Sequence, residues 1–143
     1  MTKRILVPLD PRDDAESLIS LVADLARGAG ATVRLLHVAP LPQNQISEYG
    51  RIVVFASQER ERLEARGHDH LVAVGARLEG VPVENRVRFG DLAEETVLES
   101  EVFGAELIAL GARRRRWWHS LALGRTARRI ARRATAPVLV LAC

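Results

Sequence analysis

The segment between Gly111 and Gly124 holds the residues of this 143-residue chain that are best suited to bind a phosphate group. It follows a short apolar run, 107–110, and it precedes a segment with helical spacing that opens at Gly124. A glycine-bearing loop between a strand and a helix commonly holds phosphate, because the first N–H groups of the helix point at the anion. Here the loop also carries four consecutive arginines, 113–116, and guanidinium groups pair well with phosphate.

Asp10 is a second candidate, because it directly follows the apolar run 5–9. In an open α/β sheet, ligands bind beyond the carboxyl ends of the strands, where the strand order reverses. If the order is 3-2-1-4-5, Asp10 and Gly111 face the same crevice. By position alone, Asp10 is explained equally well as a turn residue before a helix.

Five segments have the patterns of strands that would position these residues. Four are short apolar runs. The other alternates apolar and polar residues after Pro82, which favours an edge strand with one wet face. The segments are 5–9, 33–38, 81–89, 107–110 and 138–141. His37, within the second run, is expected to be a core residue whose polar atoms are satisfied.

Four segments between the strands have helical spacing or composition, and they are 13–28, 46–78, 91–104 and 124–134. Within the second of them, Gly67 is expected to interrupt the helix. Asp13 with Glu16, and Asp91 with Glu94, have the spacing of capping boxes. Strands that alternate with helices predict a doubly wound, mostly parallel α/β sheet. No linker or repeat is evident, so residues 1–143 are expected to form a single domain.

Composition excludes several classes of protein. The apolar runs are too short to span a bilayer, and the first ten residues lack the apolar core of a signal peptide, so we expect a cytoplasmic protein without a membrane segment. The sole cysteine, Cys143, excludes an intramolecular disulfide. His68 and His70 lack a third metal ligand at helical spacing, which favours a solvated helix face over a metal site. No catalytic triad is suggested, so the sequence predicts no enzyme, with weak ATP hydrolysis left open.

The chain resembles the universal stress protein family over nearly its whole length. The resemblance rests on five pieces in order: ILVPLD, LLHVAP, the Gly90-Asp91 turn, ELIALG and ATAPVLVL. It implies a five-stranded parallel sheet of order 3-2-1-4-5 with about four helices, of the adenine nucleotide alpha hydrolase-like type. It also implies cytoplasmic homodimers of two subgroups, one of which binds ATP or AMP while the other lacks the nucleotide site.

The nucleotide-binding subgroup carries a glycine, two residues, a second glycine, nine residues, and then a glycine followed by serine or threonine. Gly111 and Gly124 match the first and third glycines at the correct spacing. Arg114 occupies the second glycine position, and Arg125 occupies the small hydroxyl position with Thr126 one step later. The resemblance also implies residues on the adenine and ribose side, which are Pro8, Asp10, Val38 and Leu110.

Both arginine replacements affect the phosphate side of the motif. If the second glycine position needs a positive φ, Arg114 costs roughly 1–2 kcal/mol there, and its side chain also fills space that a phosphate would use. Arg125 places a cation in the first helical turn, which is unfavourable by about 0.3–1 kcal/mol unless an anion is nearby. The same guanidinium groups would pair with a phosphate. We therefore expect weak or absent ATP or AMP binding, with Mg²⁺ accompanying ATP, and no required cofactor.

Trp117 and Trp118 are the only tryptophans in the chain. We interpret them as apolar plugs that fold the loop onto the body, with stacking on a base as the alternative. The last strand has an apolar sequence and would be an unpaired sheet edge. Pairing with a second copy would cover it and give a two-fold homodimer, as the family does through this strand. The interface would consist of Val138, Leu139, Val140 and Leu141.

A different hypothesis treats the basic C-terminal region as an interaction surface. The chain has a net charge of +3, yet residues 113–143 hold nine arginines and no acidic residue. The remainder holds 12 basic and 18 acidic residues. Such a footprint is typical of binding to nucleic acid or another polyanion, although no nucleic-acid fold or stacking platform is recognised. Binding that vanishes above moderate salt would support this hypothesis.

Overall fold

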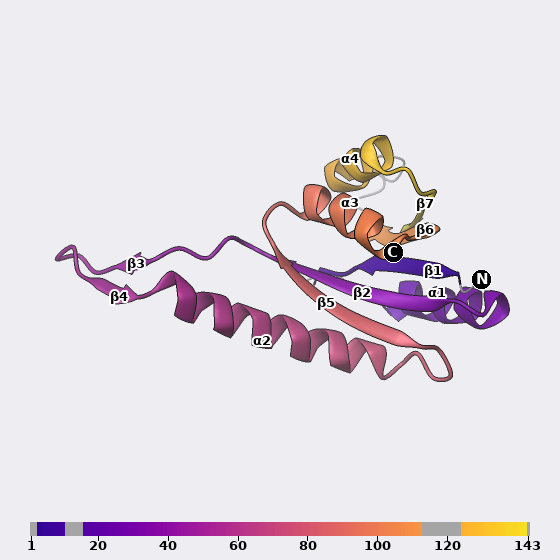
Figure 1. Ribbon diagram of the computed structural model, residues 1–143, viewed down its shortest axis with the longest axis horizontal. Coiled ribbons are helices and arrows are strands. Elements are labelled where there is room, and N and C mark those ends of the chain that lie inside the picture. Colours follow the sequence, from indigo (N-terminus) through magenta and orange to yellow (C-terminus); the bar gives the residue numbers. More distant parts are fainter. Residues whose placement is uncertain (1–2, 11–15, 113–123, 143) are drawn as a thin grey trace.

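The computed structural model describes residues 3–10, 16–112 and 124–142, and its centre is a five-stranded sheet (Figure 1). The order is β5-β2-β1-β6-β7, and every neighbouring pair is parallel. The strands are β1 (Arg4–Pro8), β2 (Thr32–Ala39), β5 (Val83–Phe89), β6 (Leu107–Ala112) and β7 (Val138–Ala142). Numbered along the sheet strands alone, this is the predicted order 3-2-1-4-5, with β5 and β7 at the two edges.

The helices form a layer on each side of the sheet. Helices α1 (Glu16–Ala29) and α2 (Ala56–Gly75) contribute to one apolar core, and α3 (Leu92–Phe103) and α4 (Arg125–Arg133) contribute to the other. Alternation along β1 explains the two cores, because Ile5 and Val7 belong to the first and Leu6 belongs to the second. None of the helices in the described ranges is long and apolar enough to cross a membrane.

The expectation of a helix from residue 46 is wrong. A small antiparallel hairpin occupies that place, formed by β3 (Gln45–Ile46) and β4 (Ile52–Val54), and α2 begins only at Ala56. Gly50 makes the turn with a φ of +77°, which glycine adopts readily. The run of β-branched residues in β4 favours a strand.

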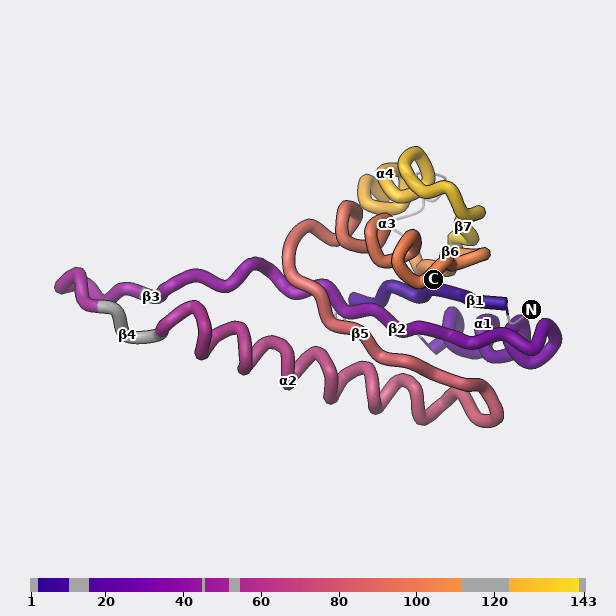
Figure 2. Tube along the Cα trace, viewed as in Figure 1, coloured from indigo at the N-terminus to yellow at the C-terminus, as the bar shows by residue number. Residues whose placement is uncertain are grey.

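The hairpin and its flanking residues form an extension of the molecule. We call residues 40–55 the arm. In Figure 2 the chain leaves the end of β2, reaches the turn at the far end of the molecule, and returns to the start of α2. At its base, the N–H of Ala56 donates to the Asn44 side-chain oxygen at 2.7 Å, and the N–H of Phe55 donates to Gln58 Oε1 at 3.2 Å. These bonds fix where the helix starts.

Gly67 does not interrupt α2, contrary to the expectation from sequence. The helix is continuous through it, and Gly67 is buried against the ring of His37 on β2. A Cβ at this position would overlap Cδ2 of His37 and lie 3.3 Å from Cγ and from Nε2 of the same ring. The glycine therefore allows the helix to approach the sheet closely.

A buried carboxylate lies between α3 and the sheet. Glu99 is 1% exposed, and it accepts from Arg34 at 2.8 Å and from Arg88 at 2.7 Å, with Arg86 at 3.3 Å. Arg34 also stacks over the ring of Phe103, 4.1 Å from its centroid. The face of β5 that was expected to contact solvent is thus partly covered by α3. Glu99 balances part of the positive charge of the arginines on that face.

The start of α3 agrees in part with the predicted capping box. Asp91 is the N-cap, and its side chain accepts from the N–H of Glu94 at 3.0 Å. The Glu94 carboxylate instead lies 3.9 Å from Arg129 and 3.8 Å from Arg133 of α4. Asp13, the other predicted cap, lies outside the described residues.

Candidate functional site

The carboxyl ends of β2, β1 and β6 lie next to one another and bring together the residues predicted for the adenine and ribose side. Leu6 of β1 pairs with Ile108 of β6, so Pro8 and Leu110 lie two residues further along neighbouring strands. On the other side, β1 pairs with β2, which ends just after Val38. These residues lie up to about a hundred positions apart in the sequence. The parallel sheet places them at the same end of its strands.

The residues predicted at these strand ends are three apolar side chains, a glycine and one carboxylate. Pro8 and Leu110 are buried, whereas Val38, Asp10 and Gly111 are partly exposed. Apolar residues with a few polar groups are the composition expected at a site for a small organic ligand. The structure therefore places the four residues predicted for the adenine and ribose side at the carboxyl ends of neighbouring strands, and their role in binding stays a prediction.

The predicted phosphate side corresponds to the N-terminus of α4. Because β7 is parallel to β6, the helix between them must run back along the sheet. Its start therefore lies near the carboxyl ends of the strands. Gly124 is the N-cap, and no side chain of the described residues caps it. Arg125 is exposed in the first turn, and Thr126 is partly exposed beside it. The first N–H groups of this helix suit an anion.

Arg114 lies outside the described residues, as do the other loop arginines and both tryptophans. The assignment of Arg114 to the second glycine position therefore remains a prediction from spacing. The described parts of the motif, Gly111 and Gly124, lie at the end of β6 and the start of α4 as that spacing requires.

The arginines of α4 divide into two groups. Arg129 bonds to Asp91 at 3.1 Å, and it and Arg133 approach Glu94 of α3. The backbone N–H of Glu94, followed by the Arg129 side chain, lowers the pKa of Asp91. The second group is exposed and makes no ion pair with any residue in the described part of the chain; it consists of Arg125, Arg128 and Arg132. Their spacing of three and four residues places them along one side of the helix.

His37 is a feature of the crevice region that sequence reasoning missed. It was expected to be satisfied, but its Nδ1 has no hydrogen-bond partner among the described residues. Its ring lies between Gly67 and His70 of α2, with 6.3 Å between the two histidine centroids. Burial first, and then His70, lowers the pKa of His37, while the Leu9 backbone and the charge of Asp10 act in the opposite direction. The neutral form is thereby favoured beside Asp10.

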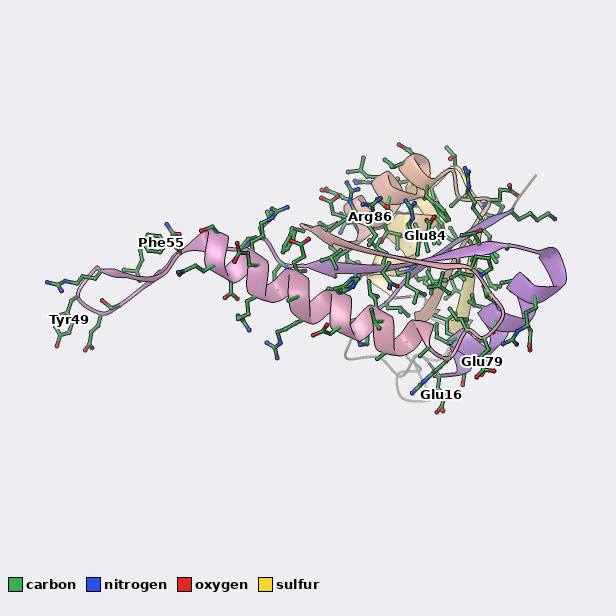
Figure 3. The ribbon with its side chains drawn as sticks, turned by 60° about the horizontal axis from the view of Figure 1, so that its bottom comes forward. Glu16, Tyr49, Phe55, Glu79, Glu84 and Arg86 are labelled. Atoms are coloured by element: carbon green, nitrogen blue, oxygen red, sulfur yellow. The ribbon has the colours of Figure 1, made fainter. Side chains whose placement is uncertain are left out.

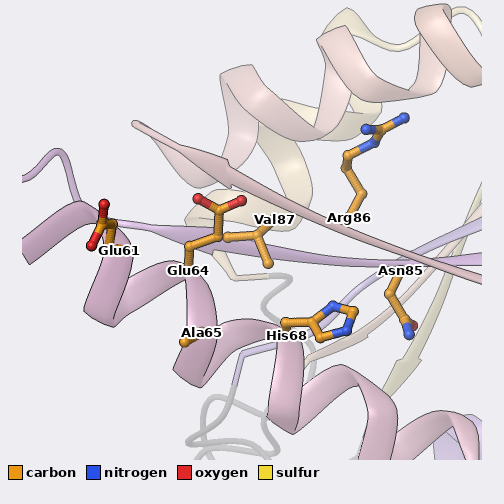
Figure 4. Close-up of a pocket in the computed structure, with 7 residues that line it drawn as sticks. All are labelled: Glu61, Glu64, Ala65, His68, Asn85, Arg86 and Val87. Atoms are coloured by element: carbon orange, nitrogen blue, oxygen red, sulfur yellow. The ribbon is translucent and has the colours of Figure 1, made fainter. Parts of the chain in front are cut away.

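A second hollow lies between α2 and β5 (Figure 4). It has a volume of about 460 Å³, and its lining includes Glu61, Glu64, His68 and Asn85. None of the predicted site residues lines it. His68 faces this hollow while His70 faces His37, and no group of three possible metal ligands occurs among the residues described.

Comparisons with known proteins agree with this geometry. A sequence model of the universal stress protein family matches residues 1–142. Among solved structures, the hypothetical protein MJ0577 is similar with a TM-score of 0.77 and 23% identity, over 100% of this chain and 97% of that one. A universal stress family protein from Burkholderia pseudomallei has a TM-score of 0.71 and 25% identity, over 97% and 95% of the two chains.

A third similar structure is the universal stress protein from Archaeoglobus fulgidus in complex with dAMP. It has a TM-score of 0.66 and 20% identity, over 96% of each chain. No curated protein matches this chain.

Proposed function

Because the chain belongs to the universal stress protein family, we propose that it is a cytoplasmic stress-response binding module whose crevice holds an adenine nucleotide only weakly or not at all. The observation that carries this proposal is Arg125, which stands exposed in the first turn of α4 at the position of the family's small hydroxyl residue. The proposal includes no catalysis. Asp10 is the only carboxylate among the predicted crevice residues, and ATP hydrolysis needs a group that positions water besides a Mg²⁺ ligand.

The adenine and ribose side supports nucleotide binding. Val38 offers partly exposed apolar surface to a base next to the strand ends at the buried Pro8 and Leu110, and Asp10 offers a carboxylate to the ribose hydroxyls. The similar Archaeoglobus fulgidus protein is a complex with dAMP. A ligand that used this half of the crevice alone would gain apolar contacts and few polar ones.

The phosphate side of the crevice opposes nucleotide binding. The open start of α4 would stabilise a phosphate through its N–H groups and dipole. Arg125 adds positive charge at this helix start, but its side chain is much larger than that of serine or threonine and takes space that the phosphate would need. Arg114 is expected to restrict the loop in the same way. The site therefore keeps the spacing of its first and third glycines but has less space for a phosphate.

Restoring the motif should therefore restore affinity. We expect the Arg114→Gly/Arg125→Ser variant to bind ATP and AMP at least tenfold more tightly than the parent chain, because the loop regains its small residues. Isothermal titration calorimetry at up to millimolar nucleotide measures the affinity. The fluorescence of Trp117 and Trp118, which lie between the two motif glycines, provides a second signal.

Two controls make this result specific. Arg113→Gly removes an arginine one position before the motif position and should change affinity less than twofold. Val38→Arg, added to the restored variant, should remove the gained binding if the base lies between β2 and β6. A parent chain that binds more tightly than the restored variant would show that the arginines hold the phosphate, and no binding by either chain would refute the nucleotide crevice.

We also propose homodimer formation through β7. This strand is at the edge of the sheet, and its residues Val138, Leu139, Val140 and Leu141 are only partly buried. A two-fold axis beside the strand would continue the sheet into a second copy. The charge-free sequence of the strand favours such pairing.

The unpaired side of α4 favours a second candidate function, binding of a nucleic acid backbone. Arg125, Arg128 and Arg132 form an exposed row, whereas Arg129 and Arg133 are engaged by α3. Contacts of this kind depend on salt and not on sequence. They would add to the charge of the arginines at 113–116.

A salt titration tests this candidate. Each phosphate contact contributes about 0.9 to the slope of log affinity against log salt, so the triple variant Arg125→Gln/Arg128→Gln/Arg132→Gln should lower the magnitude of that slope by about 3. Fluorescence anisotropy of a labelled duplex oligonucleotide measures it. A charge-matched control replaces three exposed arginines of α2 and its C-terminal end with glutamine, namely Arg60, Arg66 and Arg77. Equal slopes for the two variants would eliminate α4 as the binding surface.

A further inference from the structure

The arm, residues 40–55, extends from the body of the molecule as a separate unit. Its two strands form a sheet of their own and do not join the five-stranded sheet. Figure 3 shows Tyr49 at the far end of the arm and Phe55 near the start of α2.

The arm is unusually apolar for an exposed segment. Four large apolar side chains on it are at least half exposed: Leu41 at 66%, Ile46 at 65%, Tyr49 at 84% and Phe55 at 53%. Single exposed apolar residues are common, but several on one short segment indicate an interaction surface. Isolated two-stranded hairpins are only marginally stable in water, so this one needs a surface against which to pack.

The charges of the arm favour one type of partner. Residues 40–55 contain a single acid, Glu48, and a single base, Arg51, on either side of the turn. A nucleic acid would require an excess of positive charge, and a membrane surface would favour a basic polar face. A neutral surface with one charge of each sign is complementary to a copy of itself, because a two-fold axis places residue i against j and j against i.

We propose that the arm docks onto the arm of a second copy of this chain, with the turn close to the two-fold axis. Glu48 of each molecule then lies opposite Arg51 of the other. The apolar side chains on both arms cover each other. This contact involves the segment that follows the carboxyl end of β2, and it is independent of the β7 pairing at the edge of the sheet.

Sedimentation velocity of the full chain over micromolar to submillimolar concentrations tests the contact. We expect Tyr49→Ser/Phe55→Ser to weaken self-association at least tenfold, because it removes apolar surface from both sides of a symmetric interface. The matched control is Leu98→Ser/Val102→Ser on α3, whose side chains are 47% and 71% exposed. This control should change self-association less than twofold, and chemical unfolding should show both variants folded.

Charge reversal tests the geometry of the contact. Glu48→Arg should weaken self-association, and the added Arg51→Glu exchange should restore it to within twofold of the parent. In a Cys143→Ser background, Tyr49→Cys should form an intermolecular disulfide, whereas Val102→Cys should not. The disulfide reports the arm contact whether or not β7 also pairs. If the arm variants associate like the parent, or if the exchanged pair does not recover, the proposal is wrong while the β7 dimer stands or falls separately.

Discussion

Replacing Glu99 with alanine should lower the free energy of unfolding by about 3–5 kcal/mol, the usual consequence of removing one partner from a buried ion pair. Glu99 is almost completely buried, and Arg34, Arg86 and Arg88 surround it. Without it, three positive charges converge on a site closed by α3, with no acceptor for two short hydrogen bonds. Urea unfolding followed by circular dichroism measures the loss.

Two further variants separate charge from packing. Glu99→Gln keeps the shape of the side chain and one acceptor oxygen, so its free energy of unfolding should lie between those of the parent and the alanine variant. Glu101→Ala removes an exposed carboxylate from the same helix, and it should change the free energy of unfolding by no more than about 0.5 kcal/mol. A Glu99→Ala protein as stable as Glu101→Ala would mean that the three arginines find water or another partner at no cost.

The second large effect is expected at Gly67, where alanine should destabilise the protein despite being the better helix former. Helix propensity favours alanine by about 1 kcal/mol. The new methyl group would overlap the His37 ring, and overpacking of this kind costs typically about 1–3 kcal/mol. The ring is held between α2 and β2, so it has little room to move. The net change should be a loss of stability, measured by the same unfolding method.

Gly28 provides the opposite control, because it is also helical but nothing lies within 4 Å of the position its Cβ would take. Gly28→Ala should be neutral or stabilising. Adding His37→Ala to Gly67→Ala should recover stability relative to the sum of the single effects, since contacting residues are coupled. Additive effects in that double variant would show that the new methyl group does not contact the His37 ring.

The sequence predicted the layers of this fold better than its connections. Apolar runs gave four of the five sheet strands, because a buried parallel strand has to be apolar on both faces, and alternation of apolar and polar residues gave the edge strand β5. The strand order came from family resemblance, since periodicity contains no information about neighbours. The hairpin was missed because the helix-forming residues after Phe55 dominate a pattern that begins at residue 46. Its β-branched run and Gly50 were the available signals.

Sequence reasoning was less informative where polar residues are buried. Arg86 and Arg88 alternate with apolar residues along β5 and were expected on a wet face, and nothing in the helical spacing of α3 pointed to a buried carboxylate at Glu99. Only the packing of α3 on the sheet brings them together. His37 has the same register as the buried Leu35, which correctly indicated an inward direction, but its unpaired Nδ1 depends on the position of α2. Pro8, Val38 and Leu110 lie at the ends of neighbouring strands, as the sheet order requires, whereas Arg114 lies outside the described residues.

The two edges of the sheet differ in a way that bears on solubility. At β5, Glu84 and Arg86 are tied to Arg34 and Glu99, so charged side chains border that edge and discourage a foreign strand from adding to it. At β7 the sequence VLVLA carries no charge at all. Aggregation by strand addition is therefore blocked at one edge by the ion-pair network, and at the other it is avoided only when a specific partner strand occupies the place.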